Sequence, residues 1–216
     1  MNKNTYCKRK GIILRNDSKR FIALTFDDGP SPYTLEILKI LKTLQVKATF
    51  FILGESLDKY PGILQAIVED GHSVANHTMN HPDITQISRD VLLEEIHTLN
   101  TELKKSAVQD IRFFRPPYGA INEETYQILH ELGIIPVLWD IDTNDWDLSQ
   151  EDQIEDRVMD GIRGEKEYKI ILMHDGGGPR ERTVQALPRV IEKLKQKGYQ
   201  FLTMPEYFYH VYNIKS

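Results

Sequence analysis

The feature that most constrains this sequence is a regular alternation of short apolar runs with longer amphipathic segments, which starts at Phe21. The apolar runs are rich in β-branched and aromatic residues, as strands buried on both faces are. The seven runs are FIALTF from Phe21, ATFFIL from Ala48, SVAN from Ser73, IRFFR from Ile111, PVLWDI from Pro136, KIILMH from Lys169 and QFLTM from Gln200. We therefore predict seven strands of a parallel sheet.

The segments between the runs have the spacing of amphipathic helices. Leucines recur at three-residue intervals from Leu35 to Leu44, which places them on one helical face. Gly71 follows one such segment, at the position where a helix favours a left-handed residue. Ser88 and Ser149 stand where helix N-caps are expected. These signals predict helices between the strands.

Seven strand–helix alternations within 216 residues predict one α/β domain in which helices pack outside a parallel sheet. The length suits either an incomplete (β/α) barrel or a doubly wound open sheet, and the periodicity does not choose between them. The sequence contains no internal repeat and no linker long enough to separate a second domain.

Charge and cysteine content restrict the classes of function. The 27 Lys and Arg against 32 Asp and Glu give a net charge of −5, whereas nucleic-acid binders usually carry a net basic face. The single cysteine, Cys7, cannot close an intrachain disulfide or form a cysteine metal site. Any metal site must therefore use His, Asp and Glu. No apolar run reaches the length of about 18 residues that a membrane span needs.

The first twenty residues are basic but contain only a short apolar stretch, from Ile12 to Leu14. A signal peptide needs an apolar region of roughly 7–15 residues. We therefore expect no signal peptide in this chain, which would make it either a cytoplasmic protein or the mature form of a secreted or cell-wall protein.

Ionisable residues follow five of the predicted strands. In both candidate architectures, active sites lie at the carboxyl ends of the parallel strands. The residues found there are Asp27-Asp28-Gly29-Pro30, then His77 and His81, then Arg115 to Gly119, then Asp140, Asp142, Asp145 and Trp146, and finally His174-Asp175 followed by three glycines. Five such occurrences predict a single functional site at this end of the sheet.

Asp27 and Asp28 are adjacent carboxylates at the end of a buried strand. They would repel each other and lose hydration there unless a cation lies beside them. In a regular strand their side chains point to opposite faces, so both can serve one site only if the chain has already left the strand. The Gly29-Pro30 that follows favours such an exit, although an ordinary polar turn is the alternative for the dipeptide alone.

His77 and His81 are four residues apart and could bind one metal ion if the turn between them is helical. Pro82 disfavours a helical conformation at His81, so we expect one helical turn and no longer helix. Taken alone, this pair could be incidental in a chain with 7 histidines. Together with a carboxylate from another strand, two imidazoles would leave metal positions open for water and substrate, as catalytic sites do.

Other residues at these strand ends are ambiguous by themselves. His174 could be a core histidine at the end of an apolar strand, and Arg115 an ordinary ion-pairing arginine. The glycines from Gly176 suggest phosphate binding, but the Lys and Ser/Thr that a P-loop requires are missing. Trp139 is expected in the core, whereas Trp146 lies in a polar segment and is expected to line a cleft of sugar size.

Five sequence blocks that carry these residues resemble the signature of NodB-type polysaccharide deacetylases, which form carbohydrate esterase family 4. The blocks are TFDDGP from Thr25, HTMNHP from His77, RPPYG from Arg115, DTNDW from Asp142 and LMHD from Leu172. The resemblance implies a distorted, incomplete (β/α) barrel of about seven parallel strands in a single domain. It further implies an N-terminal extension over residues 1–20 and a catalytic domain over residues 21–216.

The resemblance implies that Asp28, His77 and His81 bind a divalent metal ion. In the family the metal is usually zinc, and some relatives use cobalt or nickel. The family's apolar lining for the acetyl group and the substrate corresponds to Trp146, Leu172 and Pro117.

The resemblance also implies the residues that move protons. Asp27 matches the catalytic base, and Arg115 matches the residue that orients this base. Tyr118 matches the residue whose backbone N–H faces the oxyanion. His174 matches the general acid, and Asp145 matches its carboxylate partner.

The activity implied is hydrolysis of a linear, non-peptide amide, which releases N-acetyl groups from N-acetylglucosamine in chitin-like or peptidoglycan polysaccharides by metal-activated water. The expected partner is an N-acetylated polysaccharide or oligosaccharide. Three alternatives stand beside this hypothesis: an esterase of the same fold that removes O-acetyl groups from xylan, a hydrolase of a small non-sugar amide, and a catalytically silent carbohydrate-binding protein.

Overall fold

The computed structural model describes residues 19–106, 108, 110–149, 153–163 and 167–212. Cys7 and the first 18 residues of the predicted N-terminal extension lie outside the described residues. No helix in the described ranges is both long enough and apolar enough to cross a membrane.

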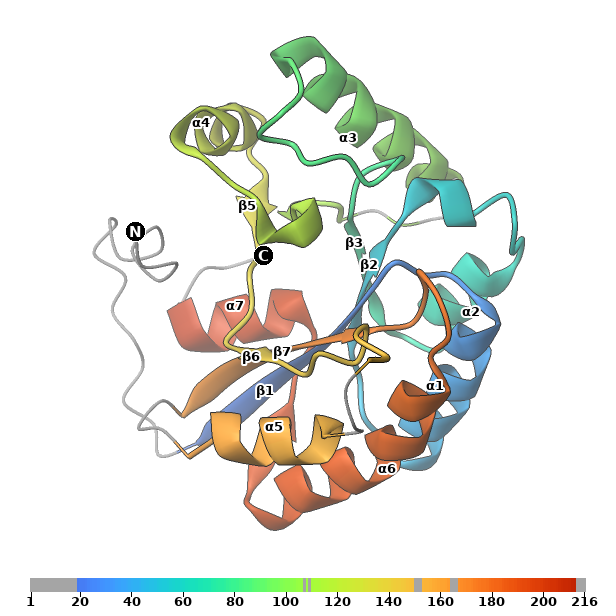
Figure 1. Ribbon diagram of the computed structural model, residues 1–216, viewed down its shortest axis with the longest axis vertical. Helices are drawn as coiled ribbons and strands as arrows, with labels where there is room; N and C mark the ends of the chain where they lie inside the picture. The colour runs from blue at the N-terminus through green and yellow to red at the C-terminus, as the bar shows by residue number, and fades with distance from the viewer. Residues whose placement is uncertain (1–18, 107, 109, 150–152, 164–166, 213–216) are drawn as a thin grey trace.

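The described strands form one eight-stranded sheet in which all neighbouring strands are parallel (Figure 1). Their order is β5-β4-β3-β2-β1-β7-β6, and β8 pairs with the first residues of β1. The strands are β1 (Arg20–Asp27), β2 (Thr49–Ile52), β3 (Ser73–Asn76), β4 (Phe113–Phe114), β5 (Ile135–Pro136), β6 (Ile141–Asp142), β7 (Tyr168–His174) and β8 (Tyr199–Phe201).

The sheet is curled. β5 and β6 are its two end strands in the pairing order, but only residues 137–140 separate them along the chain, so the two ends of the sheet must lie near each other. The run that begins at Pro136 is therefore two strands and not the one predicted. Val137 N–H donates to Phe114 O, and Asp140 N–H donates to Ile170 O, so the backbone changes its partner strand within three residues. In the described residues β5 and β6 do not pair, and the barrel is incomplete, as predicted.

Helices surround the curled sheet, and β1 and β7 cross its centre (Figure 1). They are α1 (Pro32–Thr43), α2 (Ile63–Glu69), α3 (Arg89–Lys105), α4 (Glu123–Glu131), α5 (Ile154–Gly161), α6 (Glu181–Gln196) and α7 (Met204–Tyr212), with 3₁₀ turns η2 (Gly54–Ser56) and η3 (Pro117–Gly119). Ser88 is the N-cap of α3, as predicted. The prediction for Ser149 is wrong: Gln153 occupies the N-cap position of α5, and the Ser149 hydroxyl bonds Asp147 instead.

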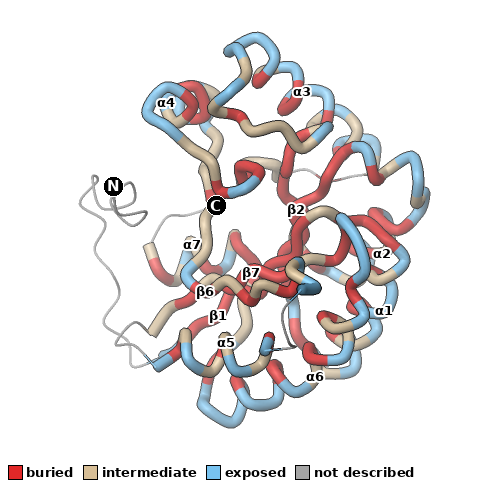
Figure 2. Tube along the Cα trace, viewed as in Figure 1, coloured by how far each residue is buried: buried red, intermediate tan, exposed pale blue. Residues whose placement is uncertain are grey.

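Both faces of β1 are buried, and each packs against a different part of the molecule (Figure 2). Ile22, Leu24 and Phe26 belong to the large cluster between the sheet and the outer helices. Phe21 and Ala23 belong to a second cluster that includes residues of α7. Because side chains alternate along a strand, Thr25 and Asp27 lie on the same face as this second set. The period of two thus directs the last carboxylate of β1 into the barrel.

Candidate active site

The predicted site residues converge at the carboxyl ends of the strands. Asp27 is the last residue of β1, and it is in register with His174, the last residue of β7. His77 directly follows β3, and Arg115 directly follows β4. The prediction that the ionisable residues gather at one end of the sheet is confirmed for these four. Asp140 is an exception, because it precedes β6 and its Oδ2 accepts from Ile170 N–H at 3.0 Å, well before the end of β7.

A buried ion pair fixes the Asp27 carboxylate. Arg115 is 0% exposed, and its Nη1 lies 2.7 Å from Asp27 Oδ1. The same nitrogen donates to Thr25 Oγ1 at 2.8 Å, and Nε donates to Val137 O at 3.2 Å. The guanidinium carbon lies 4.1 Å from the centre of the Phe51 ring, so an aromatic face covers it. These contacts leave Asp27 with one oxygen, Oδ2, that faces the rest of the site.

Asp28 leaves the strand and turns its side chain toward the two histidines. Its φ of 71° is left-handed, so the chain has departed from the strand geometry as predicted from Gly29-Pro30. Asp28 Oδ1 lies 3.4 Å from His77 Nε2 and 3.5 Å from His81 Nε2. The ligand atoms of these three residues all lie within 4.8 Å of one another.

The segment between His77 and His81 is not the single helical turn that was predicted. Thr78 and His81 have φ angles of 71° and 58°, so the backbone is left-handed at two non-glycine residues. The two imidazole rings nevertheless approach to 5.0 Å between centres. A loop, and not a helix, brings them together.

These three residues fit a divalent cation. Asp28 Oδ1 is buried and has no hydrogen-bond partner among the described residues, although two imidazole nitrogens face it. His77 Nδ1 lies 2.7 Å from Arg115 O, which places the ring proton on Nδ1 and leaves the Nε2 lone pair toward Asp28. One carboxylate and two imidazoles are a common ligand set of catalytic zinc.

Charges in this cluster shift the pKa values of its members. Burial raises the pKa of Asp28, but the neighbouring imidazoles, that of His77 most of all, lower it by more, and the net shift is downward. Burial together with the nearby His77 lowers the pKa of His81. Both shifts favour the forms that can bind a cation, an ionised carboxylate and a neutral imidazole.

A second buried pair fixes His174. Its Nδ1 lies 2.7 Å from Asp145 Oδ1, and its backbone N–H donates to Asp145 Oδ2 at 2.8 Å. Thr183 Oγ1 also donates to Oδ2, at 2.7 Å. Burial lowers the pKa of His174, but Asp145 raises it by more, with smaller effects from Asp27 and Asp28, to about 9. His174 is therefore an imidazolium at neutral pH with its Nδ1 proton directed to Asp145.

The remaining predicted residues surround these groups to different degrees. Trp146 is 51% exposed and Tyr118 is 68% exposed, whereas Leu172 and Pro117 are buried. The Tyr118 ring lies edge-on to that of His81, with 4.7 Å between centres. Trp139, predicted to lie in the core, is only partly buried, and its ring centre lies 5.7 Å from the Arg115 guanidinium carbon.

The glycines after His174 make room for Asp28. A Cβ on Gly176 would lie 2.0 Å from Asp28 O, and one on Gly177 would lie 2.5 Å from Asp28 Oδ2. Gly177 also has a φ of 72°, which other residues rarely adopt. The sequence offered this glycine run, but its link to Asp28 depends on the pairing of β1 with β7.

Asp175 is a buried carboxyl group for which the sequence indicated a place at a strand end but no partner. Its side chain accepts a hydrogen bond from Thr34 in α1, and its carbonyl accepts one from the N-cap residue Ser31. Burial, opposed by the Thr34 hydrogen bond, raises the pKa of Asp175 to about 7. The residue thus joins the end of β7 to the start of α1, directly behind the loop that carries Asp28.

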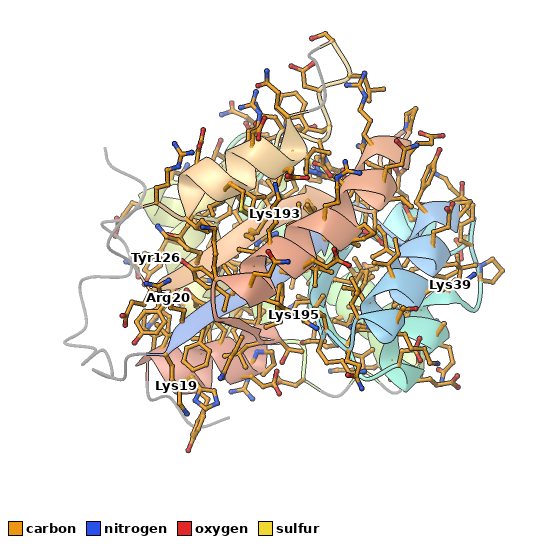
Figure 3. All side chains as sticks on the ribbon, turned by 90° about the horizontal axis from the view of Figure 1, so that it is seen from below. Lys19, Arg20, Lys39, Tyr126, Lys193 and Lys195 are labelled. Atoms are coloured by element: carbon orange, nitrogen blue, oxygen red, sulfur yellow. The ribbon has the colours of Figure 1, made fainter. Side chains whose placement is uncertain are left out.

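A hollow of about 550 Å³ lies at the opposite end of the barrel. It is lined by Arg20, Met159, Ile162, Arg163, Lys193, Gln196, Lys197 and Tyr199. Arg20 and Lys193 are labelled in Figure 3. Arg20 begins β1 and Asp27 ends it, about 23 Å apart at strand rise. Two of the cations that line the hollow have local partners: Lys193 pairs with Glu155, and Arg20 donates to Lys197 O at 3.3 Å. Because α5 and α6 end here, these cations offset the helix dipoles.

Comparison with known proteins identifies similar sequences. The sequence model described as "Polysaccharide deacetylase" matches residues 14–137. The chain is 38% identical over 194 residues to a peptidoglycan-N-acetylglucosamine deacetylase of Bacillus cereus. The aligned region covers 88% of this chain and 69% of that protein. It is 34% identical over 222 residues to a chitooligosaccharide deacetylase of Rhizobium leguminosarum bv. trifolii, which covers 95% of this chain and 100% of that protein.

A solved structure agrees with the sequence comparisons. The crystal structure of a peptidoglycan N-acetylglucosamine deacetylase in complex with 4-naphthalen-1-yl-N-oxidanyl-benzamide superposes with a TM-score of 0.83. It has 37% sequence identity and covers 90% of this chain and 91% of that chain. The likeness thus extends over nearly the whole fold.

Proposed function

Because the chain belongs to the polysaccharide deacetylase family, we propose that it removes N-acetyl groups from N-acetylglucosamine in a peptidoglycan or chitin-like polysaccharide or oligosaccharide. The observation that carries this proposal is the meeting, at one edge of the barrel, of three ligand residues, a carboxylate held by Arg115 and an imidazole held by Asp145. We assign the catalytic domain to residues 21–216 and an N-terminal extension to residues 1–20.

Asp28, His77 and His81 would hold the divalent metal ion on which the proposed reaction depends. Zinc suits this ligand set, and cobalt or nickel could replace it. When bound, such an ion polarises a carbonyl oxygen and lowers the pKa of a bound water molecule to about 7. The orphaned Oδ1 of Asp28 supports the assignment, because a buried carboxylate oxygen without a partner otherwise costs stability.

Asp27 is the proposed catalytic base. Its Oδ2 lies 3.8 Å from His77 Nε2, so a proton acceptor is placed next to the proposed metal ligands. Arg115 holds the other oxygen in a fully buried ion pair, which fixes the orientation of the carboxylate. Asp27 would take the proton from water as that water attacks the acetyl carbonyl carbon.

His174 is the proposed general acid. The amine of an amide leaves poorly, so the tetrahedral intermediate breaks down only when its nitrogen receives a proton. Asp145 holds His174 in the protonated form and fixes Nδ1, which leaves Nε2–H as the proton to be donated. The register of Asp27 with His174 places the proposed base and the proposed acid side by side on adjacent strands.

Tyr118, Trp146, Leu172 and Pro117 are the proposed surroundings of the substrate. The backbone N–H of Tyr118 would face the developing oxyanion, and a donor of this kind is typically worth about 10²–10³ in rate. Trp146 presents an exposed ring on which a sugar can stack, while Leu172 and Pro117 would line the acetyl methyl.

The test is acetate release by the full chain from N-acetylglucosamine oligomers, peptidoglycan and acetylated xylan, each with zinc present. We expect release from an N-acetylated glycan. Release from xylan alone would favour the O-acetyl esterase instead. Binding of these glycans without any release would favour a silent carbohydrate-binding protein.

A further inference from the structure

The loop that carries the two proposed histidine ligands has a backbone that its own sequence does not favour. Thr78 and His81 are both left-handed, a conformation in which non-glycine residues are uncommon. Two hydrogen bonds inside the loop support it: Asn76 Oδ1 accepts from Thr78 N–H at 2.8 Å, and Thr78 Oγ1 accepts from His81 N–H at 3.0 Å. The loop backbone is also bound to η2, where Gly54 N–H donates to Thr78 O at 3.1 Å and Glu55 N–H donates to Met79 O at 2.8 Å.

Helix α3 adds side-chain support at Asn80, the residue directly before His81, through Glu95. This side chain is buried, and its two oxygens bind the same residue: Oε2 accepts from Asn80 N–H and Oε1 from Asn80 Nδ2, both at 2.8 Å. One turn away, Asn76 Nδ2 donates to Ile96 O at 3.1 Å and to Asn100 Oδ1 at 2.8 Å. Helix α3 thus forms hydrogen bonds with residues on both sides of His77, Asn76 and Asn80.

His81 depends on this support more than His77 does. The His77 ring is oriented by Arg115 O, 2.7 Å from Nδ1, and its side chain is 3% exposed. The side chain of His81 is 24% exposed, and no described residue hydrogen-bonds to either of its ring nitrogens. Its position therefore depends more on the backbone that carries it, and Asn80 directly precedes it in that backbone.

We propose that Glu95 is a positioning residue for the metal site, acting through Asn80 on His81. The inference rests on the metal site of the proposed function. Residues that orient metal ligands indirectly typically change metal affinity by about 10–100-fold. Glu95 touches neither substrate nor ligand, and its effect should appear as weaker metal binding.

The Glu95–Asn80 pair allows a reciprocal exchange as a test. Asn80→Asp replaces the hydrogen bond from Asn80 Nδ2 to Glu95 Oε1 with two carboxylate oxygens that face each other, neither of which can donate. Adding Glu95→Gln to Asn80→Asp restores the bond in reverse, because the Gln amide donates to Asp and its oxygen still accepts Asn80's backbone N–H. The double variant also has the wild-type net charge. Since the extra charge of Asn80→Asp alone would attract a cation, a loss of affinity in this variant reports position and not charge.

The experiment loads the full chain with Co²⁺ and, in parallel, with Zn²⁺, and measures the affinity by competition with a chromogenic chelator. We expect about tenfold weaker binding in Asn80→Asp and Glu95→Ala, and recovery to within about twofold in the Asn80→Asp/Glu95→Gln double variant. Glu94→Gln, an exposed neighbour on the same helix, is the matched control and should bind as the wild type does. Thermal unfolding of the metal-free proteins identifies any variant that fails to fold.

Unchanged affinity in a folded Asn80→Asp variant would overturn the inference and leave the metal site intact. Loss of affinity that the double variant does not recover would also overturn it. A wild-type chain that binds neither ion would overturn the metal site and this inference together.

Discussion

The pairing of His174 with Asp145 leads to a prediction about the pH dependence of catalysis. Asp145→Asn keeps the size of the side chain but removes its charge. The donors that face Oδ2, His174 N–H and Thr183 Oγ1, will hold the amide oxygen there, so the amide NH₂ will face His174 Nδ1. Both changes disfavour the imidazolium.

The magnitude follows from the pKa values. Asp145 is the largest factor that raises the pKa of His174 to about 9, against burial, from an ordinary 6.5. Without it we expect a pKa at or below about 6.5. At pH 8 the protonated fraction then falls from about 0.9 to about 0.03, roughly a thirtyfold loss of rate if the protonated form is the acid.

The assay is kcat for acetate release from an N-acetylglucosamine oligomer between pH 5.5 and 9.5. Wild type should decline only near pH 9, whereas Asp145→Asn should decline about tenfold per pH unit from about pH 6.5 upward. Thr183→Val removes a hydrogen bond to Asp145 but leaves the charge, and its decline should stay near pH 9. A loss in Asp145→Asn that is the same at pH 6.5 and pH 8 would refute the assignment of His174 as the acid.

Four further variants test the base, the ligands and the buried groups. Asp27→Asn should abolish turnover and retain zinc, whereas His77→Ala should lose both turnover and zinc. Zinc content and acetate release are measured on the same samples. Substantial activity in Asp27→Asn would exclude Asp27 as the base. Arg115→Met leaves the Asp27 charge buried without a partner and should lower the free energy of unfolding by about 3–5 kcal/mol in urea titrations; an effect below 1 kcal/mol would contradict that. Burial lowers the pKa of His72 to about 4, so the free energy of unfolding should fall by about 3 kcal/mol between pH 6.5 and pH 4. His72→Gln should flatten this pH dependence. The same pH dependence in His72→Gln as in the wild type would show that His72 does not cause it.

Much of the site could be predicted because it follows from strand ends. Buried parallel strands are apolar throughout, so the residues where each run becomes polar mark the edge at which sites form. Asp27, Arg115 and His174 were placed at this edge from that signal alone. The departure of Asp28 from the strand followed from the Gly-Pro after it, a local signal that Asp28's left-handed φ of 71° bears out.

The errors occurred where distant segments decide local structure. The spacing of His77 and His81 favoured a helical turn, but α3 stabilises a left-handed loop through Glu95, a contact across 15 positions. The run from Pro136 divides because its backbone changes from a β4 partner to a β7 partner within three residues. Periodicity within one segment carries no record of either contact.

The glycines from Gly176 illustrate the same limit in a different way. As a sequence motif they suggested phosphate, and the missing Lys and Ser/Thr argued against it. In the fold these glycines allow the close approach of Asp28, because a Cβ at Gly176 or Gly177 would collide with it. Only the parallel pairing of β1 with β7 brings these residues together.

In the proposed function, Asp28, His77 and His81 bind a metal ion on which deacetylation depends. The most direct test removes metal from the full chain with a chelator and restores zinc in steps, while bound zinc and acetate release from an N-acetylglucosamine oligomer are measured in the same samples. We predict activity that disappears on removal and returns in proportion to zinc, reaching its maximum at about one ion per chain. Full acetate release by a chain that has been shown to be free of metal would contradict the dependence of deacetylation on a metal ion.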